Sequence, residues 1–193
     1  MEDLLPLLRE FSDTADEWFS ERPFVLEEYH FIRDFFQSGN LSEAEWEDFQ
    51  ALGKRIHALR TNRLADKRAF GDPNHPIEHY RESFEYLARG EPSLPERLND
   101  VEASEGPYAI KHLSESSVGE LAGKLFAEDY LVYNARSREG LAYLGYENPE
   151  QGLSFGERFV QLTELAQPVI EAYSDVVGSR TEAPVHLEVD QLF

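Results

Sequence analysis

Asn134, Arg136 and Arg138 form the group of side chains in this sequence that is best suited to recognition chemistry. They lie in the stretch 106–145, where aromatic, basic and amide side chains occur together. Asn134 is suited to cap a helix whose first turn then carries both arginines. Positive charge there opposes the helix dipole, and an anion bound at the free N–H groups would reverse that balance. The pattern predicts either an anion-binding helix start or arginines that pair with Glu139 and neighbouring acids.

A second group of cations lies between positions 54 and 68, where there is a single acid, Asp66. The window has a net charge of +5 and leaves −25 for the rest of the chain. Because salt screens distant charges, such a stripe can contact phosphate even on an acidic body. We consider two interpretations, a solvated helix face and a phosphate-contacting surface. The six basic residues are Lys54, Arg55, Arg60, Arg63, Lys67 and Arg68.

His75, Glu78 and His79 match the H-x-x-E-H pattern of inverted zinc peptidases. That chemistry needs both histidines on one helical face, with the glutamate polarising a zinc-bound water. Pro76 favours the first helical position, which would place His75 outside the helix. A zinc hydrolase at His75 and His79 is therefore an alternative and not the expectation.

The run 119–124 is similar to a phosphate-binding loop but departs from it in two ways. Its glycines are one residue too close together, and Leu125 stands where Ser or Thr must hold magnesium. The chain also lacks a cysteine nucleophile, a Gly-x-Ser-x-Gly elbow and a recognisable nuclease cluster. We therefore expect no enzyme, no catalytic residue, no metal site and no cofactor.

The composition bounds the class of protein. The chain has 193 residues, of which 41% are hydrophobic, so it is long enough to bury a core as one domain. It has no cysteine, which excludes disulfides and thiolate metal sites. The formal net charge of −20 repels nucleic acid and anionic membranes at long range. Acids occupy the N-terminus where a signal peptide needs positive charge, and no apolar run approaches about 18 residues, so we expect a cytoplasmic protein without membrane contact.

Helical periodicity dominates the elements that must position these groups. Ser-x-x-Glu sequences at Ser42, Ser93 and Ser154 predict capping boxes at three helix starts. An aromatic-rich helix over 24–36 is expected to face the core and to close at 38–40. A further helix begins near Trp46 and is expected to run to about residue 68. Pro168 is expected to kink or end a late helix that begins after Ser154.

No hairpin dipeptide lies between alternating runs, so we expect an all-α domain of about seven to nine helices, with at most a short terminal strand. The expected domain spans 1–193. A polar connector at 102–106 allows two lobes, 1–102 and 106–193, with the Tyr-x-x-Tyr-Asn-x-Arg segment in the second. The apolar C-terminal run suggests a fragment of a longer protein.

The order of motifs over roughly 94–193 resembles the helical region of McrB-type modification-dependent restriction proteins and helix-hairpin-helix glycosylase-like DNA-binding modules. The matching segments are 96–98, 118–126, Tyr133-Asn134-x-Arg136, 140–145 and 187–190. Those relatives carry a Gly-x-Gly hairpin where this chain has residues 112–115, and the GTPase motor of McrB proteins is absent from this sequence. The resemblance therefore implies a DNA-recognition or accessory module of a restriction or defence system, and neither a motor nor a nuclease.

Two functions are consistent with these patterns. The first is a non-catalytic module associated with nucleic acid, in which cations neutralise phosphates and Tyr130 or Tyr133 stacks on a base. The second is an acidic protein–protein interaction subunit, in which the arginines pair with internal acids. The exposure of the basic residues distinguishes the two. The predicted contact residues are Lys54, Arg55, Arg60, Arg63, Lys67, Arg68, Lys111, Tyr133, Asn134, Arg136 and Arg138.

Overall fold

The computed structural model describes residues 4–60, 63–71 and 75–193, without the side chains of Ser38 and Arg63. In these ranges every regular element is helical, which confirms the all-α prediction. The described residues form twelve α-helices, more than the seven to nine expected. None of these helices combines the length and the apolar character needed to cross a bilayer. The elements are α1 (Leu4–Ser20), α2 (Phe24–Phe35), α3 (Ser38–Glu43), α4 (Trp46–Gly53), α5 (His57–Arg60), α6 (Arg63–Asp66), the π-helical turn η1 (Lys67–Gly71), α7 (Ile77–Arg89), α8 (Leu94–Glu102), α9 (Glu115–Leu125), α10 (Ala135–Tyr143), α11 (Phe155–Val176) and α12 (Val185–Leu192).

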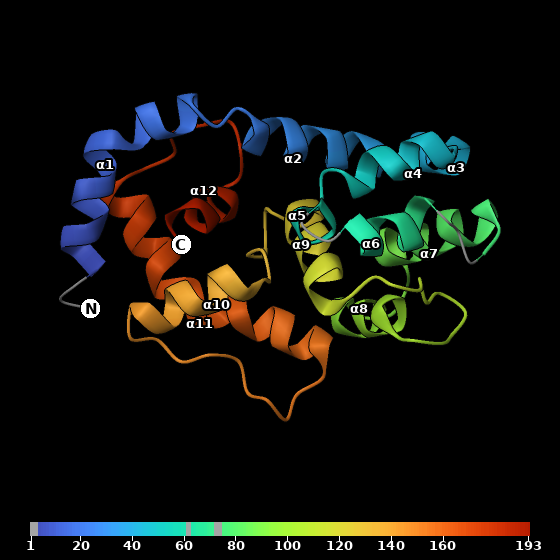
Figure 1. Ribbon diagram of the computed structural model, residues 1–193. Coiled ribbons are helices and arrows are strands. Elements are labelled where there is room, and N and C mark those ends of the chain that lie inside the picture. The colour runs from blue at the N-terminus through green and yellow to red at the C-terminus, as the bar shows by residue number, and fades with distance from the viewer. Residues whose placement is uncertain (1–3, 61–62, 72–74) are drawn as a thin grey trace.

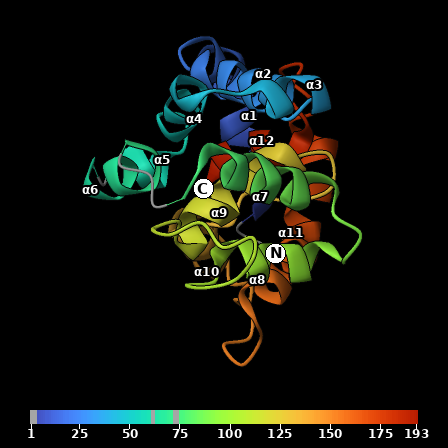
Figure 2. The same cartoon turned by 90° about the vertical axis from the view of Figure 1, so that its right-hand side faces the viewer.

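Helix α9 lies near the middle of the molecule and packs against α2, α5 and α8 (Figure 1). Helix α11 packs against α1, α8 and α12. In Figure 1, α1 and α10 to α12 gather on the left and α3 to α8 on the right, while α2 runs across the top. Figure 2 views the molecule from the side of α3 to α8. The arrangement brings N-terminal, central and C-terminal helices together around α9.

One large hydrophobic core draws buried side chains from both sides of the connector 102–106. Aromatic rings fill much of it: Phe49 stacks on Phe84 with ring centroids 5.7 Å apart, and Phe36 meets Phe84 edge-on. Phe35 and Phe36 of the expected aromatic-rich helix are buried there, as predicted. The suggested division into two lobes stays a prediction, although α8 and α11 pack together across it.

The continuous helix predicted from Trp46 to about residue 68 is wrong. Helix α4 ends at Gly53, and the short elements α5, α6 and η1 follow it. In a continuous helix the N–H groups of His57 and Ala58 would bond to the preceding turn. Here they donate to the carboxylate of Glu120 from α9, so a tertiary contact restarts the helix. The basic residues at 54–68 are therefore spread over several short elements.

The short terminal strand that the sequence allowed does not form, because residues Val185–Leu192 make helix α12. Glu188 of this helix is completely buried. Its carboxylate accepts hydrogen bonds from the Tyr173 hydroxyl at 3.0 Å and from the backbone N–H groups of Arg180 and Thr181. These bonds fasten α12 to α11 and to the loop that joins them.

Two of the three predicted capping boxes are confirmed, at Ser93 and at Ser154. The box predicted at Ser42 is wrong, since α4 begins one turn later. Its capping box uses Glu45, whose N–H donates to the Asp48 carboxylate at 2.9 Å.

The helix expected over 24–36 forms as α2 and ends at Phe35. Residues 38–43 form α3, where the sequence indicated the close of the preceding helix. Of the two outcomes expected at Pro168, a kink or an end, the end does not occur. Helix α11 continues past Pro168, which occupies an exposed position inside it. At such a position solvent can satisfy the carbonyl that loses its N–H partner.

Glycines on α9 allow the connector 131–133 to lie directly against that helix. A Cβ at Gly119 would come within 2.6 Å of the Tyr133 carbonyl oxygen, and one at Gly123 within 2.5 Å of Val132 Cα. Neither distance is compatible with a real side chain, and both obstacles are backbone. The connector has no helical structure, as the sequence predicted, and the two glycines fix its distance from α9.

We expect Gly123→Ala to lower the free energy of unfolding by about 1–3 kcal/mol, because the new methyl group must displace the backbone of Val132. Urea denaturation measures the change. The matched control is Gly39→Ala in α3, where a Cβ would meet no atom within 4 Å, and we expect it to be neutral or stabilising. Equal stability of the two variants would contradict the close approach at Gly123.

Candidate functional site

A charged cleft of about 500 Å³ lies among α2, α5, α9, α10 and α12. It is the place where the two predicted groups of recognition residues meet. Arg60 from the basic stripe lines it, together with Asn134 and Arg136 from the start of α10. Four other charged side chains line the same cleft: Glu28, Glu120, Lys124 and Asp190.

Lys124 is the central cation of the cleft and is largely buried. Its ammonium group donates to Glu120 at 2.6 Å, to Glu28 at 2.8 Å and to the backbone carbonyl of Arg55 at 2.9 Å. Burial alone would lower the pKa of Lys124, but the adjacent carboxylates of Glu120 and Glu28 raise it overall. The ammonium group has three N–H donors, and all three are used inside the protein.

Glu120 lies one turn before Lys124 on α9 and is buried. Its two carboxylate oxygens accept from the N–H of His57 at 2.7 Å and from the N–H of Ala58 at 3.0 Å. It therefore caps the start of α5 from another helix, where negative charge is favourable. The glycines and the lysine that make 119–124 similar to a phosphate loop have structural roles here. The glycines face the connector 131–133, and Lys124 pairs with the carboxylates of Glu28 and Glu120.

Asp190 brings α12 into the cleft. It forms an ion pair with Arg136 and accepts from the Ser137 hydroxyl at 3.1 Å. Burial raises the pKa of the Asp190 carboxyl, and the charge of Arg136 offsets part of that effect. Arg136, in the first turn of α10, is thus paired with a carboxylate of the protein itself.

The two stripe arginines near the cleft also have internal partners. Arg60 lies 3.6 Å from a Glu28 oxygen, and its guanidinium is 3.1 Å from the His57 ring nitrogen. Arg55 donates to the Ala51 carbonyl at 2.9 Å and lies 3.6 Å from the centroid of the Phe31 ring. The stripe thus supplies one cation to the cleft and uses another in packing.

Four of the other predicted basic residues do not line the cleft: Lys54, Lys67, Arg68 and Lys111. Lys54 follows α4, and Lys67 and Arg68 lie in η1, all of them exposed. Lys111 is exposed in the loop before α9. Arg63 begins α6, and its side chain lies outside the described residues.

Tyr133 cannot stack on a base, which corrects the prediction for this residue. Its side chain is only 2% exposed and packs edge-on against Phe155, with centroids 5.6 Å apart. Arg138 lies beside the same ring, 5.3 Å from its centroid, and donates to the Asn134 carbonyl. Asn134 caps α10 as predicted, accepting from the Ser137 N–H at 2.9 Å. Tyr130 is half-buried and packs against Phe159.

The H-x-x-E-H histidines lie close together, with ring centroids 4.1 Å apart. One nitrogen of His79 bonds to the Ala109 carbonyl at 2.9 Å. Burial, followed by the charges of His79 and Lys111, lowers the pKa of His75. In the part of the chain that the structure describes, no group of three or more potential ligands is placed to hold a metal ion.

Sequence reasoning missed most of the cleft's acidic side. Glu28, Glu120 and Asp190 come from three helices that only tertiary packing brings together. One signal was available: Glu120 and Lys124 are an i,i+4 pair of opposite charge, and every other residue of the helix from Val118 to Leu125 is apolar or glycine.

No protein-family model matches the chain, and no curated protein or solved structure matches it significantly. The resemblance to McrB-type and helix-hairpin-helix modules therefore stays a prediction.

We expect Lys124→Met to lower the free energy of unfolding by about 3–5 kcal/mol, because Glu28 and Glu120 then remain buried without their cation. Chemical denaturation measures the loss. The double variant Glu120→Gln/Lys124→Met should lose less than the sum of the single variants, because the two residues act as one unit. Lys67→Met, at an exposed position, is the control. A cost for Lys124→Met no larger than that of the control would refute the buried network.

Proposed function

We propose that the protein is an acidic, non-catalytic protein-interaction module that binds a basic protein segment and makes no direct contact with nucleic acid. The pairing of cations at the cleft is the observation that supports this most strongly. Four ion pairs use the cleft's three positive side chains: Lys124 with Glu28 and with Glu120, Arg136 with Asp190, and Arg60 with Glu28.

Paired cations are poor phosphate ligands in this setting. An incoming phosphate would compete with Asp190 for Arg136, and drawing Arg136 away would leave that carboxylate buried without its cation. It would also approach Glu28, which is already shared between Lys124 and Arg60. The formal charge of −20 adds a long-range repulsion for DNA and an attraction for basic proteins.

The same pairing supports a non-catalytic role. Lys124 has no donor left over, and both oxygens of Glu120 accept hydrogen bonds. A general acid or base needs a free position within hydrogen-bond reach of its substrate. These two groups instead hold α5 and α9 together.

One observation favours the alternative, a DNA-recognition or accessory module as the family resemblance implies. The side chains of Arg60 and Arg136 are 51% and 48% exposed and line the same cleft, so each has guanidinium surface open to solvent. In that case the two arginines and Asn134 would contact the phosphate backbone.

Fluorescence anisotropy separates the two functions. The probes are labelled single- and double-stranded DNA and a labelled peptide of alternating arginine and leucine. We expect the peptide to bind at low salt and still measurably at about 0.15 M salt, where charges beyond about 8 Å are screened. We expect neither DNA to bind at either salt concentration.

The variant Arg60→Gln/Arg136→Gln controls for the cleft. If the peptide is the ligand, its affinity should stay the same or rise slightly, because positive charge is lost. Salt-sensitive DNA binding that this variant abolishes would refute our proposal and support the DNA-recognition alternative.

A further inference from the structure

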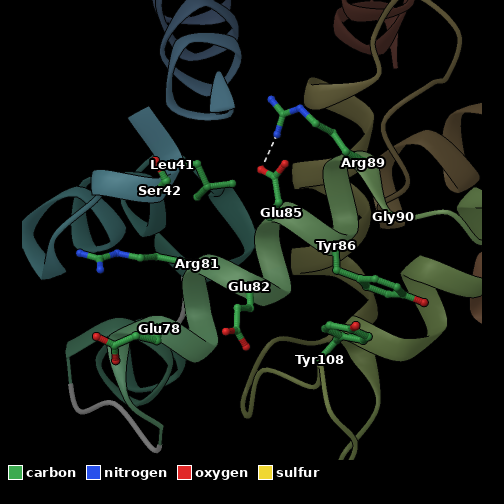
Figure 3. A pocket seen from close by; sticks show the side chains of 10 residues that line it. All are labelled: Leu41, Ser42, Glu78, Arg81, Glu82, Glu85, Tyr86, Arg89, Gly90 and Tyr108. Carbon is green, nitrogen blue, oxygen red and sulfur yellow. Dashed lines mark hydrogen bonds and ion pairs between the residues drawn. The ribbon is translucent and has the colours of Figure 1, made fainter. Parts of the chain in front are cut away.

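A groove of about 680 Å³ runs along α7, on a part of the molecule separate from the charged cleft. Leu41 and Ser42 of α3 border it on one side, and Tyr108 borders it on another. Figure 3 shows its side chains, most of which come from α7: Glu78, Arg81, Glu82, Glu85, Tyr86 and Arg89. Of the groove residues on α7, Glu78 alone belongs to a motif of the sequence, the H-x-x-E-H pattern.

The two arginines of the groove are already engaged. Arg81 donates to the Ala44 carbonyl at 2.9 Å and to Glu45 at 3.1 Å. Arg89 pairs with Glu85 at 2.6 Å, as Figure 3 shows, and donates to the Phe36 carbonyl. Both therefore hold neighbouring segments in place and are not available to neutralise the other acids.

Glu78 and Glu82 are exposed, and neither has a hydrogen-bond or ion-pair partner among the residues that the structure describes. They are four residues apart on α7 and so share one helical face. Like charges at this spacing destabilise a helix by a few tenths of a kcal/mol. A cation placed between them would relieve that repulsion and gain two carboxylate contacts.

Aromatic rings line the groove next to these acids. Tyr86 and Tyr108 stack almost parallel, with centroids 3.7 Å apart. The Tyr86 hydroxyl donates to Asp100 at 2.5 Å, and burial together with that bond raises the pKa of Tyr86 to about 12. The pair is thus held in place in the unbound protein. A planar guanidinium can stack on such a ring while it also bonds a carboxylate.

We propose that this groove is the docking site for an arginine-bearing segment of a partner protein, with Glu78 and Glu82 as the carboxylate contacts and Tyr108 as the stacking surface. Charge complementarity selects this occupant, since unpaired acids and aromatic rings are the ligands that guanidinium groups prefer. A volume of about 680 Å³ suits a few side chains of a segment and not a folded domain. The inference rests on the proposed interaction function and locates it.

The test titrates the arginine–leucine peptide into the full chain and its variants and follows anisotropy at about 0.15 M salt. We expect Glu78→Gln/Glu82→Gln to raise Kd about fivefold, because two solvent-exposed ion pairs are lost. The matched control is Asp13→Asn/Glu17→Gln, which removes the same charge from exposed positions four residues apart on α1. We expect the control to change Kd less than twofold, since it alters only the long-range field.

Tyr108→Leu separates stacking from charge. We expect it to raise Kd about threefold with an unchanged dependence on salt, because the ring contributes and the net charge stays the same. Replacing arginine by lysine in the peptide should weaken binding to the wild-type protein more than to Tyr108→Leu.

The outcomes keep the two proposals apart. Peptide binding that Glu78→Gln/Glu82→Gln and Asp13→Asn/Glu17→Gln weaken equally would overturn the groove and leave the interaction function standing. No peptide binding to the wild-type protein would overturn both. Binding that depends on the groove acids but is indifferent to Tyr108→Leu and to lysine would overturn the preference for arginine.

Discussion

One turn of α9 carries the ion pair on which the surrounding helices depend. Glu120 and Lys124 are buried side by side and bond each other, and each also bonds groups from other elements. Glu120 caps the start of α5, and Lys124 bonds Glu28 of α2 and the Arg55 carbonyl in the turn between α4 and α5. A buried charge without its partner costs several kcal/mol, so these contacts form together or not at all. On an adjacent face, Gly119 and Gly123 admit the connector 131–133 that leads to α10, which makes α9 the helix that sets the positions of the others.

The charged side chains fall into two groups: those paired within the cleft, and the exposed acids along α7. Inside the cleft each cation has a carboxylate partner, and the stabilisation serves the fold. Along α7 the arginines are occupied by carbonyls and by Glu45 and Glu85, which leaves Glu78 and Glu82 exposed without partners among the described residues. Because the chain has 38 acids and 18 Lys and Arg residues, carboxylates stay exposed to a partner after the buried cations are paired. The cleft that holds predicted recognition residues is thus the more structural of the two hollows, and the groove is the better candidate for binding.

The sequence predicted correctly those features that depend on residues close together in the chain. The all-α class, the caps at Ser93, Ser154 and Asn134, and the burial of the aromatic residues after Phe24 follow from spacing within one segment. The predictions failed where a distant group decided the outcome. Glu120 interrupts the helix after Gly53, and the buried bonds of Glu188 accompany a terminal helix where a strand was allowed. The sequence pattern indicated Tyr133 as a recognition residue. The connector 131–133 lies so close to α9 that the Tyr133 side chain is buried.

We propose that Glu78 and Glu82 of α7, and not the arginines of the cleft, form the binding surface. Amide chemical-shift mapping on isotope-labelled protein tests it most directly, with the arginine–leucine peptide and DNA titrated in separate experiments. We expect the peptide to change the amide chemical shifts of α7 and Tyr108, and we expect DNA to change none. Shifts at Arg60, Asn134 and Arg136 on addition of DNA, with α7 unperturbed by the peptide, would contradict it.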